Sequence, residues 1–214
     1  MITLLLSGIA IAKGHAQFTK NLKYGVGVGP NLSTLSGDSQ GDNSYVPGVT
    51  AGFYTQKPLD NGVILETGLY YANVGSKSTS QFYDEVTFEE REQKERYTLS
   101  YLNVPFVARY HVSENVSVFA GPQISFLVGA KKKVEYGDEK DKRNAKDEFK
   151  TAAVSLSVGA SYEFSSGDRV QLTVNPGLSN NTKSEGDYPG YGGNKGRVNA
   201  LIIAWFCPLF GGAE

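Results

Sequence analysis

The strongest constraint on the fold is a regular alternation of large apolar residues with small or polar ones in the middle of the chain. Over residues 101–133, "YLNVPFVARYHVSENVSVFAGPQISFLVGAKKK", bulky residues recur at every second position in two long runs separated only by "SEN". Successive side chains of a β-strand point to opposite faces, so this period predicts two adjacent strands that share one apolar face. What lies against that face decides the class of protein.

The opposite face of these strands is unusual for a protein that folds in water. In residues 117–129 and 153–163 it consists largely of Ser, Gly and Gln, with hardly a Lys or Glu. A soluble barrel would bury its bulky residues and present charges to water, whereas small polar residues suit the interior of a narrow barrel. We therefore interpret the pattern inside out, with the bulky face packed against lipid tails.

The connections between the predicted strands are alternately long and short. The short ones are "DNG" (residues 60–62), "SEN" (113–115) and "SSGD" (165–168), and each carries residues typical of tight hairpins. The long polar connections cover residues 36–46, 79–95, 137–148 and 185–195. They separate eight predicted strands, at residues 23–35, 47–59, 62–78, 96–112, 116–135, 149–164, 169–184 and 196–210.

The length of these strands favours a membrane. Strands in globular sheets average about 5 to 6 residues, whereas a tilted transmembrane strand needs about 9 to 11. A sheet that crosses a bilayer must close on itself, because no water is there to pair its backbone groups. The sequence thus predicts an all-β fold, an eight-stranded antiparallel up-and-down transmembrane β-barrel with its short turns on the periplasmic side.

Composition and the ends of the chain exclude several classes of function. A net charge of -1 and the lack of a basic face give no reason to expect nucleic acid as a partner. Cys207 is the only cysteine, so no disulfide framework or CxxC metal motif is possible, and we interpret it as a strand residue. The apolar run in residues 1–16, ending in "GHA", predicts a secretory signal peptide, with the barrel domain in residues 17–214.

Four segments resemble the porin-family outer-membrane β-barrel domain of Gram-negative bacteria, which is related to small OmpA/OmpX-type barrels. They are "YGVGVGPNLSTL", "YLNVPFVARYHV", "VFAGPQISFLVGAKKK" and "AAVSLSVGASYEF", within a spacing that covers residues 18–210. The resemblance implies an outer-membrane location, an eight-stranded barrel and no shared catalytic residues. It also implies insertion by the barrel-assembly machinery, which reads an aromatic end of the last strand. Here Pro208 and the residues after Phe210 depart from the family pattern.

A small set of polar residues falls on the inward face. By strand parity Glu66, Arg109, Gln123 and Glu163 point into the lumen, together with Gln171, Thr173 and Asn175. A buried charge is costly unless it is paired, so we expect Arg109 to meet at least one of the two carboxylates. One interpretation is a structural plug that fills the barrel. The other is a gated polar path for protons or small ions.

Two further groups are placed by their positions along the strands. Tyr110, Tyr162 and Phe164 fall on the apolar face next to short turns, which predicts a periplasmic aromatic girdle. Lys131, Lys132 and Lys133 follow a lipid-facing run at its outer end, where they would contact lipopolysaccharide phosphates or simply be solvated. The loop "GDYPGYGGNKG" suits contact with a surface protein or ligand, and equally a plain flexible tip.

These observations predict a non-enzymatic outer-membrane protein with a structural, adhesion or surface-binding role through four extracellular loops. No catalytic, cofactor-binding or metal-binding set is evident: His15 lies in the signal, and His111 lies beside a short turn away from the loops. The glycines of "GVGVGPNL" do not form a dinucleotide fingerprint, and we expect them to relieve crowding in the lumen. The alternatives are a minor channel for small solutes or ions and a soluble lipocalin-like carrier.

Overall fold

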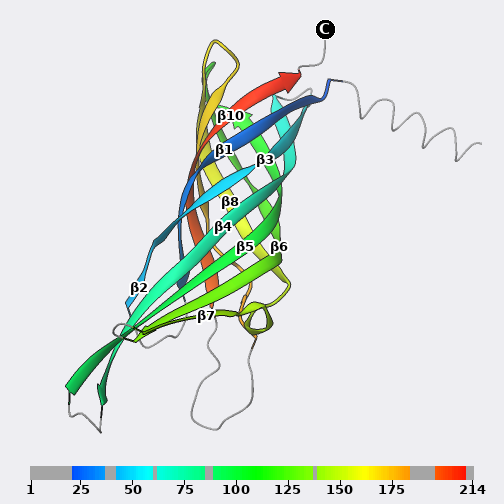
Figure 1. The fold of residues 1–214 in the computed structure, drawn as a ribbon. Coiled ribbons are helices and arrows are strands. Elements are labelled where there is room, and N and C mark those ends of the chain that lie inside the picture. The colour runs from blue at the N-terminus through cyan, green and yellow to red at the C-terminus, as the bar shows by residue number, and fades with distance from the viewer. Residues whose placement is uncertain are drawn as a thin grey trace, which may run out of the picture.

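The computed structural model describes residues 21–36, 42–59, 62–84, 89–136, 139–183 and 196–210. The predicted signal (residues 1–16) and the long connection at residues 185–195 lie outside the described residues. Within these ranges the chain forms one tall barrel of tilted strands (Figure 1). The described part contains no helix long and apolar enough to cross a membrane.

Eight strands make the closed ring, which confirms the predicted fold class. In ring order they are β1 (Lys23–Ser36), β3 (Val46–Pro58), β4 (Val63–Asp84), β5 (Glu89–His111), β6 (Val116–Tyr136), β8 (Ala152–Glu163), β9 (Arg169–Asn175) and β10 (Arg197–Phe210). Every neighbouring pair is antiparallel, and β10 pairs with β1 to close the sheet. All the backbone edges of the ring are thereby covered.

The last strand pairs with both of its neighbours in spite of its internal proline. Ala200 to Phe206 pair with β9, and the strand pairs with β1 as far as Tyr24 opposite Phe210. The β1–β10 register shifts by one residue between Tyr24 and Gly25, next to Pro208. A bulge tolerates a residue that has no N–H to donate, so Pro208 leaves the closure intact.

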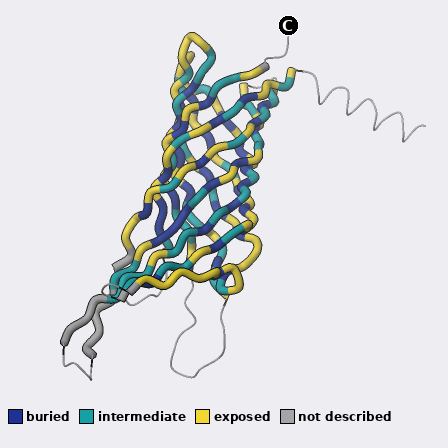
Figure 2. The backbone as a smooth tube through the Cα atoms, viewed as in Figure 1, coloured by how far each residue is buried: buried dark blue, intermediate teal, exposed yellow. Residues whose placement is uncertain are grey.

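Burial alternates along the strands as the sequence pattern predicts (Figure 2). The large apolar residues of the strand pattern are on the outer face. The exposed side chains include Phe53, Leu69, Phe106, Leu172 and Ile203. Small and polar residues share the inner face with packed rings such as Phe119 and Phe206, and the described part of the barrel has no wide apolar cavity for a cargo. The soluble-carrier alternative is therefore wrong, because the face that would line its cavity points outward.

The predicted long connection at residues 79–95 is mostly sheet. β4 continues to Asp84, β5 begins at Glu89, and the two pair without interruption, as in Thr79 opposite Lys94. Charged residues on both faces suggested a solvated loop, but a ribbon that projects beyond a membrane meets water on both sides. The polar composition therefore does not oppose strand pairing there.

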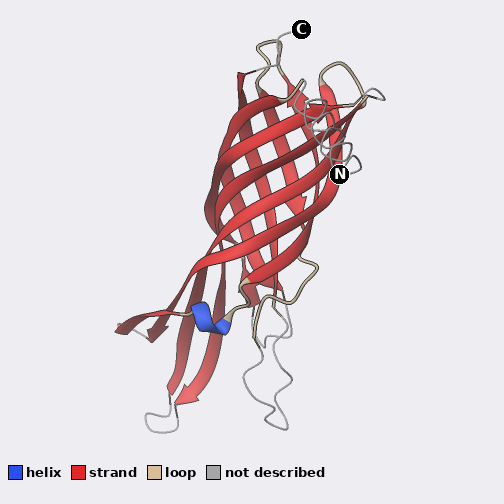
Figure 3. Ribbon diagram, turned by 90° about the vertical axis from the view of Figure 1, so that its right-hand side faces the viewer, coloured by secondary structure: helices blue, strands red, loops and turns tan. Residues whose placement is uncertain are grey.

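Two other predicted connections also contain short ordered elements. β2 (Asp42–Ser44) pairs with β4, and β7 (Glu139–Asn144) pairs with β6. A 3-10 turn, η1 (Lys146–Glu148), follows β7 and lies beside the mouth of the barrel (Figure 3). We call residues 77–84, 89–96, 131–136 and 139–144 the extension, because they prolong the wall past the ring at the end opposite the short turns.

The seventh strand of the ring is shorter than the predicted residues 169–184. β9 ends at Asn175, because the next residue, Pro176, has no N–H for the ladder. Isolated bridges hold the following segment in place: Gly177 pairs with Ser155 of β8, and Thr182 pairs with Phe149 just before β8. The prediction was thus right about the start of the strand and wrong about its end.

A bulge in β6 changes which side chains face inward. Tyr101 pairs with Leu127 but Ser100 pairs with Gly129, so Val128 is an extra residue. Before the bulge the odd-numbered residues of β6 point inward. After it the even-numbered ones do, as the buried Ala130 and Val134 show. A one-residue insertion reverses the faces of every later residue, so parity counted along the sequence fails beyond Val128.

Glycines on the inner face make room for aromatic rings, as expected from "GVGVGPNL". A Cβ added at Gly27 would lie 2.6 Å from Cε1 of Phe206, and one added at Gly159 would lie 2.5 Å from Cζ of Phe119. These distances are well inside normal contact, so both rings depend on the missing side chains.

We therefore predict that Gly27→Ala lowers the free energy of unfolding by about 1 to 3 kcal/mol, since the interior cannot accept an extra methyl group without displacing Phe206. Urea titration of the folded, faster-migrating band on unboiled gels measures this. The matched control is Gly129→Ala, where the nearest atom to the new Cβ is 3.8 Å away. Equal losses in the two variants would contradict the crowded interior.

Candidate functional site

The centre of the lumen's charge is one carboxylate held between two guanidinium groups. Oε2 of Glu66 lies 3.2 Å from Nη2 of Arg109 and 2.7 Å from Nη2 of Arg169. All three side chains are almost completely buried, Glu66 at 4% exposure and Arg109 at 2%. The group carries one excess positive charge, which further polar contacts must stabilise.

Neutral side chains complete the bonding of this charged group. Nε2 of Gln56 donates to Oε2 of Glu66 at 2.7 Å. Arg109 donates through Nη1 to Ser161 at 2.5 Å and through Nη2 to Oε1 of Gln171 at 2.7 Å. Charge-assisted bonds of this kind are among the stronger ones, so the side chains are held in fixed positions.

Aromatic rings pack against both arginines. The guanidinium carbon of Arg109 lies 4.7 Å from the ring centre of Phe119. That of Arg169 lies 4.6 Å from Tyr54 and 4.4 Å from Phe206, and these two rings meet edge to face. Rings of this kind attract cations, which offsets part of the burial cost. The lumen at this level is therefore filled by a salt bridge and its aromatic walls.

Arg169 is a lumen residue that was not predicted from the sequence, unlike Glu66 and Arg109. It has the same parity as Gln171, Thr173 and Asn175, and this parity was the available signal. Glu163 lies opposite Arg169 in the β8–β9 ladder and is only half-buried. Among the described residues its carboxylate has no ion pair, so the structure does not bring it into the group.

Gln123 belongs to a second polar group, farther from the short turns. Its Oε1 accepts bonds from Ser157 and from Nδ2 of Asn175, both at 3.2 Å. Two small cavities of about 50 and 40 Å³ lie at this level, and Asn103, Gln123 and Asn175 line both. Such polar spaces are large enough for a few ordered water molecules.

Beyond the cavities an apolar cluster fills the barrel toward the extension. Leu99, Tyr101, Leu127 and Phe149 form its centre, and each is at most 3% exposed. Phe149, which follows η1, reaches in from the connection after β7 and meets Tyr97 edge to face with ring centres 5.6 Å apart. The lumen is thus packed on both sides of the small cavities.

The residues predicted to form an aromatic girdle are exposed on the outer face near the short turns. Tyr110, Tyr162 and Phe164 are 54%, 48% and 38% exposed. Tyr162 meets Phe164 edge to face, and Phe164 stacks on Trp205 with ring centres 5.3 Å apart. Trp205 is the member of this group that the girdle prediction left out.

The three lysines at residues 131–133 do not share one face. Because of the bulge, Lys131 and Lys133 are on the outer side, whereas the side chain of Lys132 turns inward and is 12% exposed. There Lys132 pairs with Glu95 at 2.9 Å and lies 5.0 Å from the ring centre of Tyr97. Burial by itself lowers the pKa of Lys132, but its bonds to Tyr97 and Glu95 outweigh burial and raise the pKa.

The described residues offer no cluster of His, Cys, Asp or Glu that could hold a metal ion. His111 lies beside the second short turn, where its Nδ1 is 2.9 Å from Oγ of Ser117. This pair points toward the short-turn end and is distant from the extension. It is a local bond of the barrel wall rather than part of a triad that the described residues assemble.

Residues 15–183 match the family described as "Outer membrane protein beta-barrel domain". The match covers more than half of the chain. The chain belongs to this family. Barrels of this kind have short turns toward the periplasm and long connections toward the outside, so we expect the extension to be extracellular.

Solved outer-membrane proteins resemble this barrel at low sequence identity. Ail, the attachment invasion locus protein of Yersinia pestis, is 11% identical, with 88% of this chain and all 100% of that chain covered at a TM-score of 0.40. Neisserial surface protein A is 9% identical, with 86% and 95% covered at a TM-score of 0.49. A second structure of Ail holds the heparin analogue sucrose octasulfate. No curated protein matches the chain.

The charged group predicts an asymmetry between two carboxylates of this outer-membrane barrel. Glu66→Gln leaves two buried guanidinium groups without an anion and should cost about 3 to 5 kcal/mol of stability. Glu163→Gln, at a half-buried site without an ion pair in the described residues, should cost less than about 1 kcal/mol. Urea unfolding followed by gel mobility compares them, and equal losses would show that Glu66 is not the central anion.

Proposed function

We propose that this protein is a non-enzymatic, non-conducting barrel that acts at the cell surface, where it presents its extension for binding. The observation that carries the proposal is the contrast between a packed lumen and a long ordered wall outside the membrane. All the described ionised side chains deep in the lumen are engaged with each other, whereas many charges of the extension face solvent.

The packing of the lumen argues against the channel alternative. A path would have to pass the group around Glu66 and Arg109 and then the apolar cluster around Leu99 and Phe149. An eight-stranded barrel has an interior just wide enough for side chains, so neither level leaves a continuous opening. The two cavities between these levels have volumes of only about 50 and 40 Å³, which suits a few water molecules and is small for a solute path.

The length of the strands supports a role for the extension. β4, β5 and β6 have 22, 23 and 21 residues, about twice what a bilayer requires. Their excess corresponds to roughly 30 Å of sheet outside the membrane. Rigid strands keep side chains in fixed relative positions, which favours a defined binding surface over a solvated loop.

The packing of the lumen at two levels should block ion flow. The refolded protein in planar bilayers should therefore show no steady single-channel current in potassium chloride. The control is a gel of the same preparation before and after boiling, on which a mobility shift confirms that the barrels are folded. Regular, reproducible current steps from folded protein would favour the channel alternative over this proposal.

The outer part of the extension can be removed without touching the ring. Replacing residues 79–94 with an Asn-Gly turn removes the projecting ribbon of β4 and β5 but leaves the ring intact. The variant should keep the gel shift of a folded barrel, while cells that display it should lose attachment to host-cell monolayers. Full attachment by the shortened protein would exclude this ribbon as the binding surface.

A further inference from the structure

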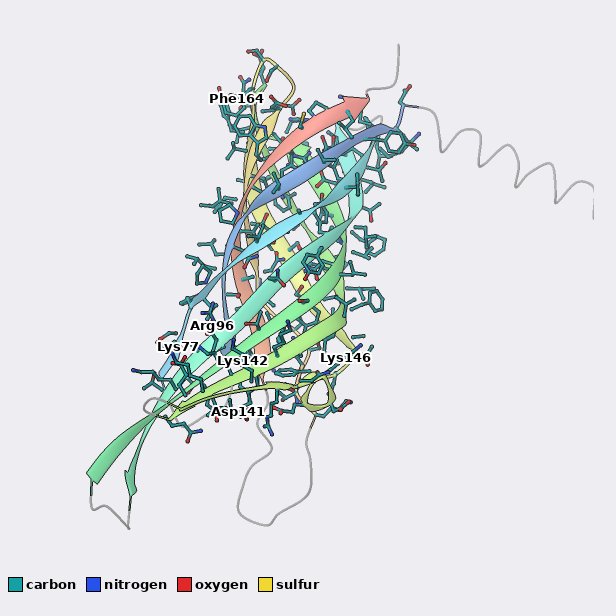
Figure 4. The ribbon with its side chains drawn as sticks, in the orientation of Figure 1. Lys77, Arg96, Asp141, Lys142, Lys146 and Phe164 are labelled. Atoms are coloured by element: carbon teal, nitrogen blue, oxygen red, sulfur yellow. The ribbon has the colours of Figure 1, made fainter. Side chains whose placement is uncertain are left out.

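Four cationic side chains stand side by side across the base of the extension. In the strand register Lys77 of β4 lies opposite Arg96 of β5, Arg96 lies opposite Lys133 of β6, and Lys133 lies opposite Lys142 of β7. Alternation puts all four on the outer face, with Lys77, Arg96 and Lys142 exposed and Lys133 half-buried. Figure 4 shows Lys77, Arg96 and Lys142 close together at this point of the wall. We call these four residues the cationic row.

A row of one sign is costly in a sheet. Directly opposed side chains have Cβ atoms about 4.5 to 5.5 Å apart, and like charges at that distance destabilise the pairing. The next row outward follows the usual rule, because Lys94 lies opposite Glu135 and Glu135 lies opposite Lys140. In the cationic row only Lys133 has an acidic partner among the described side chains, namely Glu135. The hydrogen bond from Lys133 holds the pKa of the Glu135 carboxyl below its ordinary value.

The cationic row borders a broad depression in the outer wall. The depression has a volume of about 1200 Å³ and extends from Val49 of β3 across β4, β5, β6 and β7 to Lys146, the first residue of η1. Its cations are Arg96, Lys131, Lys132, Lys133, Lys142, Arg143 and Lys146, and its described lining contains no acidic residue. Lys132 and Arg143 are engaged with Glu95 and Glu148, which leaves Arg96, Lys131, Lys142 and Lys146 without acidic partners among the described residues.

The position of the depression specifies the occupant. The rim of the depression nearest the ring holds the apolar Val49 and Val128, which end the lipid-facing band. Next come Tyr71, Asn73 and Ser100, joined by hydrogen bonds of 2.9 to 3.1 Å among their hydroxyl and amide groups. The cations follow. From the membrane outward the wall thus offers an apolar, then a neutral polar, then a cationic surface.

We propose that this depression binds the phosphorylated headgroup of an outer-leaflet glycolipid, lipopolysaccharide, with the cationic row and Lys131 on its phosphates. Acyl chains lie against Val49 and Val128, and the sugar ring lies over the group of Tyr71, Asn73 and Ser100. A soluble sulfated glycan would meet the same cations. A soluble glycan has no acyl chains to contact the lipid-facing band next to these cations, so the lipid is the occupant that the geometry favours.

The proposal assigns a different set of residues from the consecutive lysines. Lys132 faces inward and is held by Glu95, so it serves the packing of the extension rather than the headgroup. Lys77, Arg96 and Lys142 come from three strands and are far apart in sequence. The inference rests on the outer-membrane position and surface role argued above, but not on whether the lumen conducts.

The test measures binding of bisphosphorylated lipid A to the full-length refolded barrel in detergent at physiological ionic strength. The row variant, Lys77→Gln with Arg96→Gln and Lys142→Gln, removes three cations from the surface and should weaken binding roughly 100-fold. The matched control, Lys23→Gln with Lys150→Gln and Lys183→Gln, removes the same charge from exposed sites outside the depression and should stay within about twofold of the unmodified protein.

A third variant has the opposite expected direction. Glu135→Gln frees Lys133 from its ion pair, so binding of bisphosphorylated lipid A should become several-fold tighter. Damage to the fold cannot produce a gain of this kind. Without lipid A, the row variant should unfold at an equal or higher temperature than the unmodified protein, since its like-charge repulsion has been removed.

Any of three results would overturn the proposal. The first is a row variant that binds bisphosphorylated lipid A within about twofold of the unmodified protein. The second is binding of soluble sucrose octasulfate as tightly as lipid A, which would indicate a glycan site, and the third is equal affinity for dephosphorylated lipid A, which would indicate simple hydrophobic adsorption. The proposed surface role would be contradicted by different results, namely channel currents or full cell attachment after removal of residues 79–94. That removal leaves the cationic row in place.

Discussion

Closure of the sheet is the constraint on which the rest of the structure depends. In a bilayer every backbone N–H and C=O must be paired within the protein, and here the pairing of β1 with β10 completes the ring. Closure fixes which face of each strand meets lipid and which meets the lumen. The bulky alternate residues are then required on the outside, and the lumen is left to small, polar and a few large aromatic side chains that must fill it.

Filling a narrow lumen explains why the buried charges occur as one connected group. Arg109 and Arg169 reach across the barrel to a shared carboxylate on Glu66, and the missing side chains at Gly27 and Gly159 admit the rings that pack beside them. Such a group links β4, β5 and β9 across the lumen. Exposed charges without acidic partners among the described residues, such as Arg96 and Lys142, occur in the extension, where the strands run past the ring.

The sequence was sufficient for the features that depend on alternation and turns, and insufficient where one residue changes the register. The strands from Tyr101 to Glu163, the short turns and the inward position of Arg109 follow from period two. The ribbon at residues 79–95 was missed because its polarity is equally that of a loop. The inward Lys132 was missed because the extra residue Val128 reverses parity, and a bulge has no signature in this sequence. Arg169 was missed because only spatial closure brings the start of β9 opposite Glu66.

The central claim is that the bulky face meets lipid, and Trp205 reports on it directly because it is the single tryptophan of the chain. It lies on the outer face, 46% exposed, and stacks on Phe164 near the short turns. In vesicles of lipids brominated on their acyl chains, the account predicts blue-shifted emission from the folded barrel and strong quenching relative to unbrominated lipids. Emission typical of water, unaffected by the bromines, would contradict it.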